Sequence, residues 1–263
     1  MLKSRRNLGD MGMGTIKIGI LGAAGRMGRM LIREVAEGSS LVLIAATDMP
    51  GSAAIGMDAG VLVGLPSLGV TVTHNNDALF EASEVVIDFT LPTGTASHAG
   101  LAAETKTPLV IGTSGLKSAE EKAIDRAVES IAIVQAPNMS LAANLLYALT
   151  QQAADILDDT YDVAISEMHH RYKRDAPSGT ALALQAAAEA GGRKKSTIAM
   201  TAIRAGDLAG EHTVFFAGEG ERLELTHEAT SRCVFARGAI HAARWVIDKP
   251  PGRYGMKDVL GLD

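Results

Sequence analysis

Cysteine, aromatic residues and long apolar runs are all scarce in this sequence. Its 263 residues include one cysteine and one tryptophan, and only 4% of them are aromatic. Because the single Cys233 cannot form an intramolecular disulfide, the sequence favours a reducing cytoplasm, and we expect Cys233 to be a small core residue. No apolar run reaches the roughly 18 residues that a membrane helix needs, so we expect no membrane partner.

An excess of positive charge is missing as well. The formal net charge is −5 at pH 7, and no basic patch interleaved with aromatic residues appears, which argues against a nucleic-acid partner. Lys3, Arg5 and Arg6 lie near the start, but no apolar stretch of signal-peptide length follows them. We therefore expect residues 1–14 to be a flexible extension of a globular chain of one or two domains.

The first half of the chain alternates short apolar runs with helical patterns. The predicted strands lie in residues 15–22, 40–48, 84–90, 107–115 and 131–138. The predicted helices lie in residues 26–38, 95–106 and 118–130. Repeated alternation of this kind predicts an α/β fold, a Rossmann-like doubly wound parallel sheet with helices on both faces.

The pattern changes after Asn138. A long helix is predicted over residues 140–159, with Ser140 as its N-cap, and a second helix over residues 180–192. The strand patterns here lie in residues 161–169, 197–204, 213–217 and 222–228. The last of them alternates apolar and polar residues, which is typical of a half-buried strand. We therefore expect a second, α+β domain with a mostly antiparallel or mixed open sheet, beginning near residue 140.

Glycine recurs at every third position in residues 22–28, between a predicted strand and a predicted helix. Glycine lets the backbone approach a pyrophosphate, and the helix N-terminus presents free N–H groups. Asp48 ends the second predicted strand, where a carboxylate can accept hydrogen bonds from an adenosine ribose. The motif alone is also compatible with a tight strand–helix turn. The strand, the helix and the acid around it favour dinucleotide binding.

Two more turns follow predicted strands at the same sheet edge, in residues 112–115 and 136–138. Ligands in open α/β sheets bind at that edge. Each turn alone is compatible with a plain loop, but together the turns could line one crevice with the first glycine turn.

The stretch SEMHHRYKRDAPSGTA, residues 166–181, gathers two histidines and several cations before a helix. Ser178 is a candidate N-cap, and the free N–H groups around Gly179 and Thr180 predict an anion site. Lys173 adds positive charge, so a small dicarboxylate would be attracted. A histidine beside such a site can act as an acid at neutral pH.

Two other interpretations of this stretch stay open. It could be a solvated basic loop above one packed histidine. Glu167, His169 and His170 could also supply metal ligands. Zinc sites generally require three or four well-placed ligands, and the spacing here does not provide a certain third ligand, so we expect no metal. His212 and His227 fall in strand patterns and are expected to be core or interface residues.

The run EMHHRYKRDAPSGTAL resembles the signature of the 4-hydroxy-tetrahydrodipicolinate reductases, also called dihydrodipicolinate reductases. GILGAAGRMGR, VVIDFT, IGTSG, APNMSLAANLL, GEHTVFF, HEATSR and YGMKDVL fall in that family's order, so the resemblance spans about residues 15–263. It implies an oxidoreductase of lysine and diaminopimelate biosynthesis. Such an enzyme reduces 4-hydroxy-tetrahydrodipicolinate, via dihydrodipicolinate, to tetrahydrodipicolinate, with hydride passing from NADH or NADPH to C4.

The resemblance also implies roles for individual residues. His169 corresponds to the catalytic acid/base and Lys173 to a second proton donor, while His170, Gly179 and Thr180 correspond to substrate contacts. The implied cofactor contacts are Gly22, Ala23, Ala24, Gly25, Arg26, Met27, Asp48, Gly112, Thr113, Ser114, Ala136, Pro137, Asn138 and Met139. Residues 15–139 and 232–263 would form the dinucleotide-binding domain. Residues 140–231 would bind substrate and build a homotetramer.

The cofactor choice depends on the residue after Asp48. Some family members carry an arginine there, which can meet the 2′-phosphate of NADPH, whereas this chain has Met49. Arg26 is the nearby cation in the sequence. We therefore expect NADH to serve at least as well as NADPH. Two rival functions remain: another two-domain dehydrogenase, such as an aspartate or homoserine dehydrogenase, and an NAD(H)-sensing module without turnover.

Overall fold

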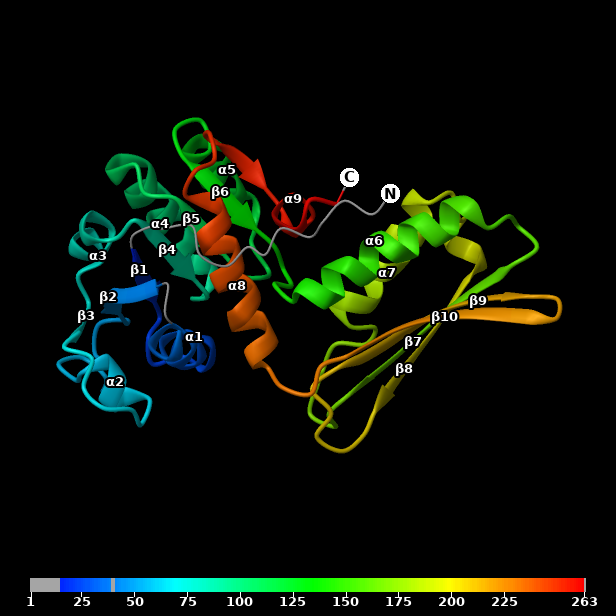
Figure 1. The fold of residues 1–263 in the computed structure, drawn as a ribbon, viewed down its shortest axis with the longest axis horizontal. Coiled ribbons are helices and arrows are strands. Elements are labelled where there is room, and N and C mark those ends of the chain that lie inside the picture. Colours follow the sequence, from blue (N-terminus) through cyan, green and yellow to red (C-terminus); the bar gives the residue numbers. More distant parts are fainter. Residues whose placement is uncertain (1–14, 39–40, 263) are drawn as a thin grey trace, which may run out of the picture.

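The computed structural model describes residues 15–38 and 41–262, and it contains two lobes, each built on its own sheet (Figure 1). The flexible extension predicted for residues 1–14 lies outside the described residues. None of the described helices combines the length and apolar composition needed to cross a membrane.

The first lobe has a seven-stranded sheet in the order β11-β6-β5-β4-β1-β2-β3. Its strands are β1 (Ile16–Leu21), β2 (Leu41–Thr47), β3 (Val72–Thr73), β4 (Val85–Asp88), β5 (Leu109–Ile111), β6 (Ala132–Gln135) and β11 (Gly252–Tyr254). All neighbouring pairs are parallel. β4 and β5 are buried at every residue, as expected for parallel strands covered on both faces. The predicted Rossmann-like sheet is confirmed.

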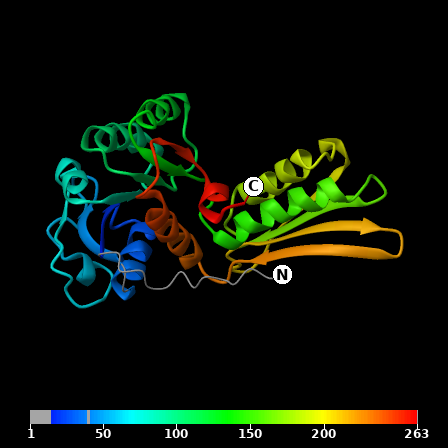
Figure 2. The same cartoon turned by 45° about the horizontal axis from the view of Figure 1, so that its top comes forward.

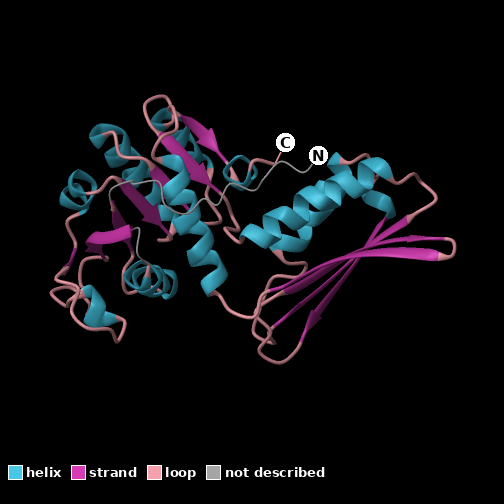
Figure 3. Cartoon of the chain, viewed as in Figure 1, coloured by secondary structure: helices cyan, strands magenta, loops and turns pink. Residues whose placement is uncertain are grey.

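Helices cover both faces of this sheet (Figure 3). They are α1 (Arg26–Glu37), α2 (Ala59–Leu62), α3 (Asn76–Ala82), α4 (Pro92–Thr105), α5 (Ser118–Ala127), α8 (Cys233–Val246) and α9 (Met256–Leu260). One buried cluster joins the sheet to α1 and α8, and a second joins it to α3, α4 and α5. Two separate apolar clusters are what a sheet buried on both sides requires.

The chain returns to the first lobe after the second lobe is complete. β11 pairs with β6, and α8 packs against α1. A Cβ atom on Gly238 in α8 would lie 1.7 Å from the carbonyl oxygen of Met139, so only glycine permits this close approach. Cys233, expected in the core, is only half-buried, because it lies in the first turn of α8 rather than on its packed face.

The second lobe has a four-stranded sheet in the order β10-β9-β7-β8, covered on one face by two helices (Figure 2). Its strands are β7 (Asp162–His169), β8 (Ile198–Arg204), β9 (Glu211–Gly218) and β10 (Glu221–Glu228). Its helices are α6 (Leu141–Ile156) and α7 (Gly179–Ala190), and a 3-10 turn, Lys195–Thr197, precedes β8. β7 and β8 are parallel and the other pairs are antiparallel, so the sheet is mixed.

Candidate functional site

The glycine turn lies between β1 and α1 and is shaped for close contact with a ligand. Gly22 has a φ of +70°, in the left-handed region that favours glycine. A Cβ atom on Gly28 would lie 2.1 Å from the carbonyl oxygen of Gly22, so the turn and the helix touch directly. Ala23, Ala24, Gly25, Arg26 and Met27 follow Gly22 into the first turn of α1. The turn therefore fits a pyrophosphate at the start of a helix.

Asp48 follows β2 and is held against this turn. Its Oδ2 accepts a hydrogen bond from the Ala24 N–H at 2.6 Å, and its Oδ1 accepts one from the Met49 N–H at 2.7 Å. The carboxylate is thus fixed in orientation beside the glycines, as recognition of ribose hydroxyls requires.

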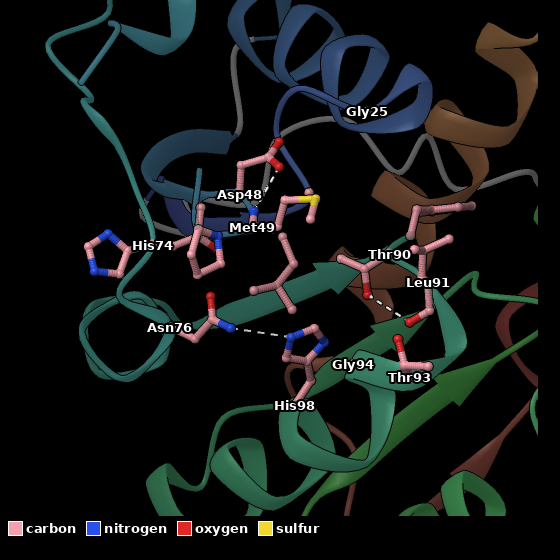
Figure 4. Close-up of a pocket in the computed structure, with 15 residues that line it drawn as sticks. Gly25, Asp48, Met49, His74, Asn76, Thr90, Leu91, Thr93, Gly94 and His98 are labelled. Carbon is pink, nitrogen blue, oxygen red and sulfur yellow. Dashed lines mark hydrogen bonds between the residues drawn. The ribbon is translucent and has the colours of Figure 1, made fainter. Parts of the chain in front are cut away.

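A cleft of about 460 Å³ lies at the carboxyl ends of β1, β2 and β4 (Figure 4). Its lining includes Gly22, Gly25, Asp48, Met49, His74, Asn76, Thr90, Leu91, Gly94 and His98. Arg26 does not line it. Sequence reasoning missed His74, Asn76, Thr90 and His98, because the order of the strands in the sheet, which no local pattern specifies, brings them beside the glycine turn.

A buried polar network forms one wall of this cleft. Asp88 has no exposed surface, and its Oδ2 lies 2.7 Å from His98 Nδ1. Its Oδ1 accepts hydrogen bonds from the backbone N–H and hydroxyl of Thr90 at 2.7 Å. Burial alone would raise the pKa of Asp88, but the hydrogen bond and charge of His98, with the Thr90 donors, hold it below its ordinary value. His98 Nε2 lies 3.3 Å from Asn76 Nδ2, so the network reaches the cleft surface.

The two other predicted turns lie at the same sheet edge, after β5 and β6. Gly112 faces the Phe89 ring so closely that a Cβ atom would lie 2.2 Å from it. The buried Thr113 hydroxyl donates to the Thr90 carbonyl at 3.1 Å, and Ser114 is exposed. In the turn after β6, Ala136 and Met139 are buried and Pro137 is exposed.

Asn138 connects the sheet edge of the first lobe with the second lobe. Its Nδ2 donates to the Thr180 hydroxyl at 3.1 Å. A predicted cofactor residue and a predicted substrate residue are thereby in direct contact.

His169 ends β7 on the buried face of the second sheet. Because side chains alternate along a strand, Glu167 shares that face, as predicted, and its Oε2 lies 2.5 Å from His169 Nδ1. Arg204 ends β8 and donates to both oxygens of Glu167, at 2.8 and 2.6 Å. The Ser178 N–H donates to Oε1 at 3.1 Å. Glu167 is thus fully buried but has four donors.

Burial and charge act in opposite directions on these groups. Burial would raise the pKa of Glu167, but Arg204 and His169 lower it below its ordinary value, so the carboxylate stays ionised. Burial lowers the pKa of His169, and the hydrogen bond and charge of Glu167 oppose that effect.

His212 in β9 lies beside His169, with ring centroids 5.0 Å apart in an edge-to-face arrangement. Burial, with the charge of His169, lowers the pKa of His212 to about 4, so its ring is neutral at pH 7. His212 is buried as expected, but it belongs to the surroundings of His169, which sequence reasoning missed. His227 in β10 lies behind it, at 6.5 Å between centroids.

Glu167, His169 and His212 could offer a metal ion ligand atoms within 4.8 Å of one another. His170, the third candidate from the sequence, is not among them. Both oxygens of Glu167 already accept from the Arg204 guanidinium, and an entering cation would compete with that charge. The donor set fits a buried ion pair better than a metal site.

The N-terminus of α7 gathers the other predicted site residues. The Ser178 side chain caps it by accepting from the Ala181 N–H at 3.2 Å, which confirms the predicted N-cap. Gly179 and Thr180 are the first two residues of the helix. A Cβ atom on Gly179 would meet nothing within 4 Å, so the space above this helix end is open.

Lys173 and His170 lie in the loop between β7 and α7. Lys173 Nζ pairs with the Asp175 carboxylate at 2.8 Å and is largely buried, and this pairing lowers the pKa of Asp175. The His170 ring lies 3.4 Å from the guanidinium of Arg232, the residue just before α8. His169, Lys173, Gly179 and Thr180 do not line the cleft at the glycine turn. The candidate site therefore has two halves, one on each lobe.

The sequence profile described as "Dihydrodipicolinate reductase, N-terminus" matches residues 16–139. The profile described as "Dihydrodipicolinate reductase, C-terminus" matches residues 142–260. Two proteins named 4-hydroxy-tetrahydrodipicolinate reductase are similar over 94% of this chain and 100% of their own length. The one from Alkalilimnicola ehrlichii is 48% identical and the one from Halorhodospira halophila is 47% identical.

Solved structures show the same fold. The dipicolinate-bound dihydrodipicolinate reductase from Paenisporosarcina sp. TG-14 is 25% identical, with a TM-score of 0.79, and the match covers 94% of this chain and 100% of that one. An amine dehydrogenase from Mycobacterium smegmatis matches with a TM-score of 0.62 at 13% identity, covering 91% and 94% of the two chains. At that identity the second likeness concerns the fold alone.

Proposed function

The chain belongs to the dihydrodipicolinate reductase family, a family of oxidoreductases, and we propose that it reduces 4-hydroxy-tetrahydrodipicolinate, via dihydrodipicolinate, to tetrahydrodipicolinate. The observation that carries this proposal is the placement of His169. Its ring is hydrogen-bonded to the buried Glu167 carboxylate, beside the open N-terminus of α7 and close to Lys173. That arrangement supplies a proton carrier and an anion site together, which is what reduction of a cyclic dicarboxylate needs.

The reaction requires a hydride and a proton. The hydride for C4 of the ring is the chemistry that a bound nicotinamide would supply. The resulting enamine needs a proton at C3, and His169 donates it. Because Nδ1 faces Glu167, Nε2 is the nitrogen left to carry that proton. Lys173, once released from Asp175, is the second group that can supply this single proton.

The substrate's carboxylates are held by α7 and its preceding loop. The N–H groups at Gly179 and Thr180 have no intrahelical partner, and the helix dipole favours negative charge there. The space above Gly179 lets a carboxylate approach the backbone. His170 and Lys173 add polar and cationic contacts.

The glycine turn and Asp48 hold the dinucleotide, and we propose that NADH serves at least as well as NADPH. Asp48 presents a fixed carboxylate to the ribose hydroxyls, and Met49 adds no cation beside it. The turns at residues 112–114 and 136–139 complete the cofactor side, while Asn138 joins it to Thr180.

We also propose a cytoplasmic homotetramer assembled through the second sheet. α6 and α7 cover one face of that sheet, and within the described chain no helix covers the other (Figure 2). A sheet face without a helix over it can pack against the same face of a second copy. The single cysteine fits a reducing compartment.

The test is nicotinamide oxidation followed at its near-ultraviolet absorbance with freshly made product of dihydrodipicolinate synthase. Turnover must depend on that product. We expect His169→Ala and Lys173→Ala each to lower kcat by about 10²–10⁴-fold while leaving cofactor affinity nearly unchanged. Cofactor binding without turnover in the wild type would indicate the sensing module instead. Near-normal kcat in His169→Ala would refute the acid assignment.

A further inference from the structure

We propose that Glu167 and Arg204 act together as positioning residues, fixing the His169 ring with Nδ1 toward Glu167 and Nε2 toward the substrate. The inference rests on the proposed function, because it assigns a partner to the proposed acid. Neither residue needs to touch the substrate for this role.

The geometry joins residues that are far apart in sequence. β7 and β8 are parallel, and their register places His169 opposite Arg204. From there Arg204 reaches back along β7 and forms two hydrogen bonds to Glu167, one to each oxygen. A bidentate pair of this kind fixes the carboxylate plane as well as its position.

The contacts of Glu167 converge on the site. Its fully buried carboxylate accepts from His169, from Arg204 and from the backbone of Ser178, the N-cap of the proposed anion-binding helix. A buried ion pair kept only for stability could be replaced by apolar residues. Here the pair holds the imidazole and the helix terminus in one fixed arrangement.

The carboxylate decides which nitrogen of His169 is left to gain and lose a proton. An ionised carboxylate only accepts hydrogen bonds, so Nδ1 must carry a proton in both the neutral and the charged ring. The proton that comes and goes is then on Nε2. Without Glu167, the neutral ring would populate both tautomers, and part of it would present the wrong nitrogen.

Arg204 also links the two proposed proton donors. Besides Glu167, its guanidinium donates to the backbone carbonyl of Asp175 at 2.6 Å. Asp175 in turn holds Lys173 through its carboxylate. A lysine at position 204 would keep the charge but lose the forked geometry that reaches both partners.

The charged groups around His169 set the expected pH response. Burial lowers the pKa of His169, the charges of Lys173 in the loop and Arg204 in β8 act in the same direction, and Glu167 opposes all three. Asp175 is paired with Lys173 and partly offsets it.

On the remaining side, β9 contributes His212, whose ring is neutral at pH 7, and β10 contributes His227 behind it, whose pKa burial also lowers. Glu167 is therefore the group whose loss removes negative charge directly from the His169 ring. The pKa of His169 should fall when that charge is lost.

The experiment compares Glu167→Gln, Glu167→Asp and Arg204→Lys in the full chain. The control is Arg193→Lys, because Arg193 is a buried arginine of the same lobe that donates to the carbonyls of Tyr161 and Leu157 instead. We expect Glu167→Gln to lower kcat about 10²-fold with KM for substrate changed by less than about threefold. The protonated form of His169 is lost as pH rises through its pKa, and that pKa should be lower in Glu167→Gln. The descending limb of the kcat–pH profile of Glu167→Gln should therefore move to lower pH. Glu167→Asp should recover part of both effects.

A second readout does not depend on turnover. Nitrogen NMR of histidine-labelled protein, assigned with His169→Ala, reports the tautomer and titration midpoint of His169. The wild type should show the Nδ1–H tautomer when neutral, and Glu167→Gln should show a mixture with a lower midpoint. Arg204→Lys should show a smaller effect in the same direction, and Arg193→Lys none.

Two failures can be told apart. A wild-type ring with Nε2–H when neutral would overturn the inference, even if no Glu167 variant folded. An unchanged midpoint in a folded Glu167→Gln protein would overturn it as well. If the NMR results appear as expected while His169→Ala keeps its turnover, the positioning stands and the proposed acid role is wrong.

Discussion

Cofactor preference depends on the few side chains that border Asp48. The Asp48 carboxylate is fixed by the N–H groups of Ala24 and Met49, so it cannot turn away from an added phosphate. Met49 lines the same cleft, and its side chain is 69% exposed. Replacing Met49 with arginine would place a forked cation next to the carboxylate.

The expected size follows from the charges. Two like unit charges about 4 Å apart repel by roughly 1 kcal/mol in water and by about 4 kcal/mol at an effective dielectric of 20. Asp48 is half-buried at the cleft surface, so a value of about 1–2 kcal/mol applies, or about 5- to 30-fold against NADPH. In Met49→Arg, a charge-assisted hydrogen bond from the new guanidinium to the 2′-phosphate should raise the affinity for NADPH relative to NADH by about tenfold.

The assay measures Kd for NADH and for NADPH without substrate, and kcat/KM for both. Met57→Arg is the matched control, because Met57 is also exposed but does not line the cleft. Raising the salt concentration should narrow the wild-type difference, since exposed charges are screened. A strong wild-type preference for NADPH would refute the reasoning from Met49. It would show that a cation more distant in sequence already neutralises the phosphate.

Three further outcomes are expected. Gly179→Val should raise KM for substrate, because the added side chain would occupy the open space through which a substrate carboxylate approaches the helix N-terminus. Cofactor Kd should stay nearly unchanged, and an equal loss of affinity for substrate and cofactor would indicate misfolding. His98→Ala should lower the urea-unfolding free energy at pH 7 by about 3–5 kcal/mol, since Asp88 loses its buried partner. The pKa of Asp88 is depressed, so this difference should narrow as pH falls below the ordinary 3.8; a constant difference would contradict the ion pair. Cofactor plus a dicarboxylate inhibitor should give a more compact particle by solution scattering than either alone, whereas identical profiles would indicate a permanently closed site.

The sequence was most informative where local periodicity decides the structure. Parallel strands buried on both faces appear as apolar runs, so the core of the first sheet could be predicted. The short elements α2, β3 and α3 could not, because two to seven residues carry too little periodic signal. His74 and Asn76 were missed with them, although both line the cleft.

The same limit applies to the second half of the site. The period of a strand predicted that Glu167 and His169 share a face, and this is confirmed. Arg204 lies 37 residues from Glu167 and meets it only through the register of β7 with β8, which no local pattern specifies. His212 was predicted from its strand pattern as a core or interface residue, yet it lies opposite Glu167 in the register and its ring is 5.0 Å from that of the proposed acid.

The order in which the chain is made conflicts with the order in which its lobes can be finished. β1 and α1 leave the ribosome early, but α8, which packs on α1, and β11, which completes the sheet, are encoded after the whole second lobe. Domains generally fold as units during synthesis. The second lobe can therefore fold while the face of α1 that packs on α8 is still exposed, and that face stays uncovered until α8 has been synthesised.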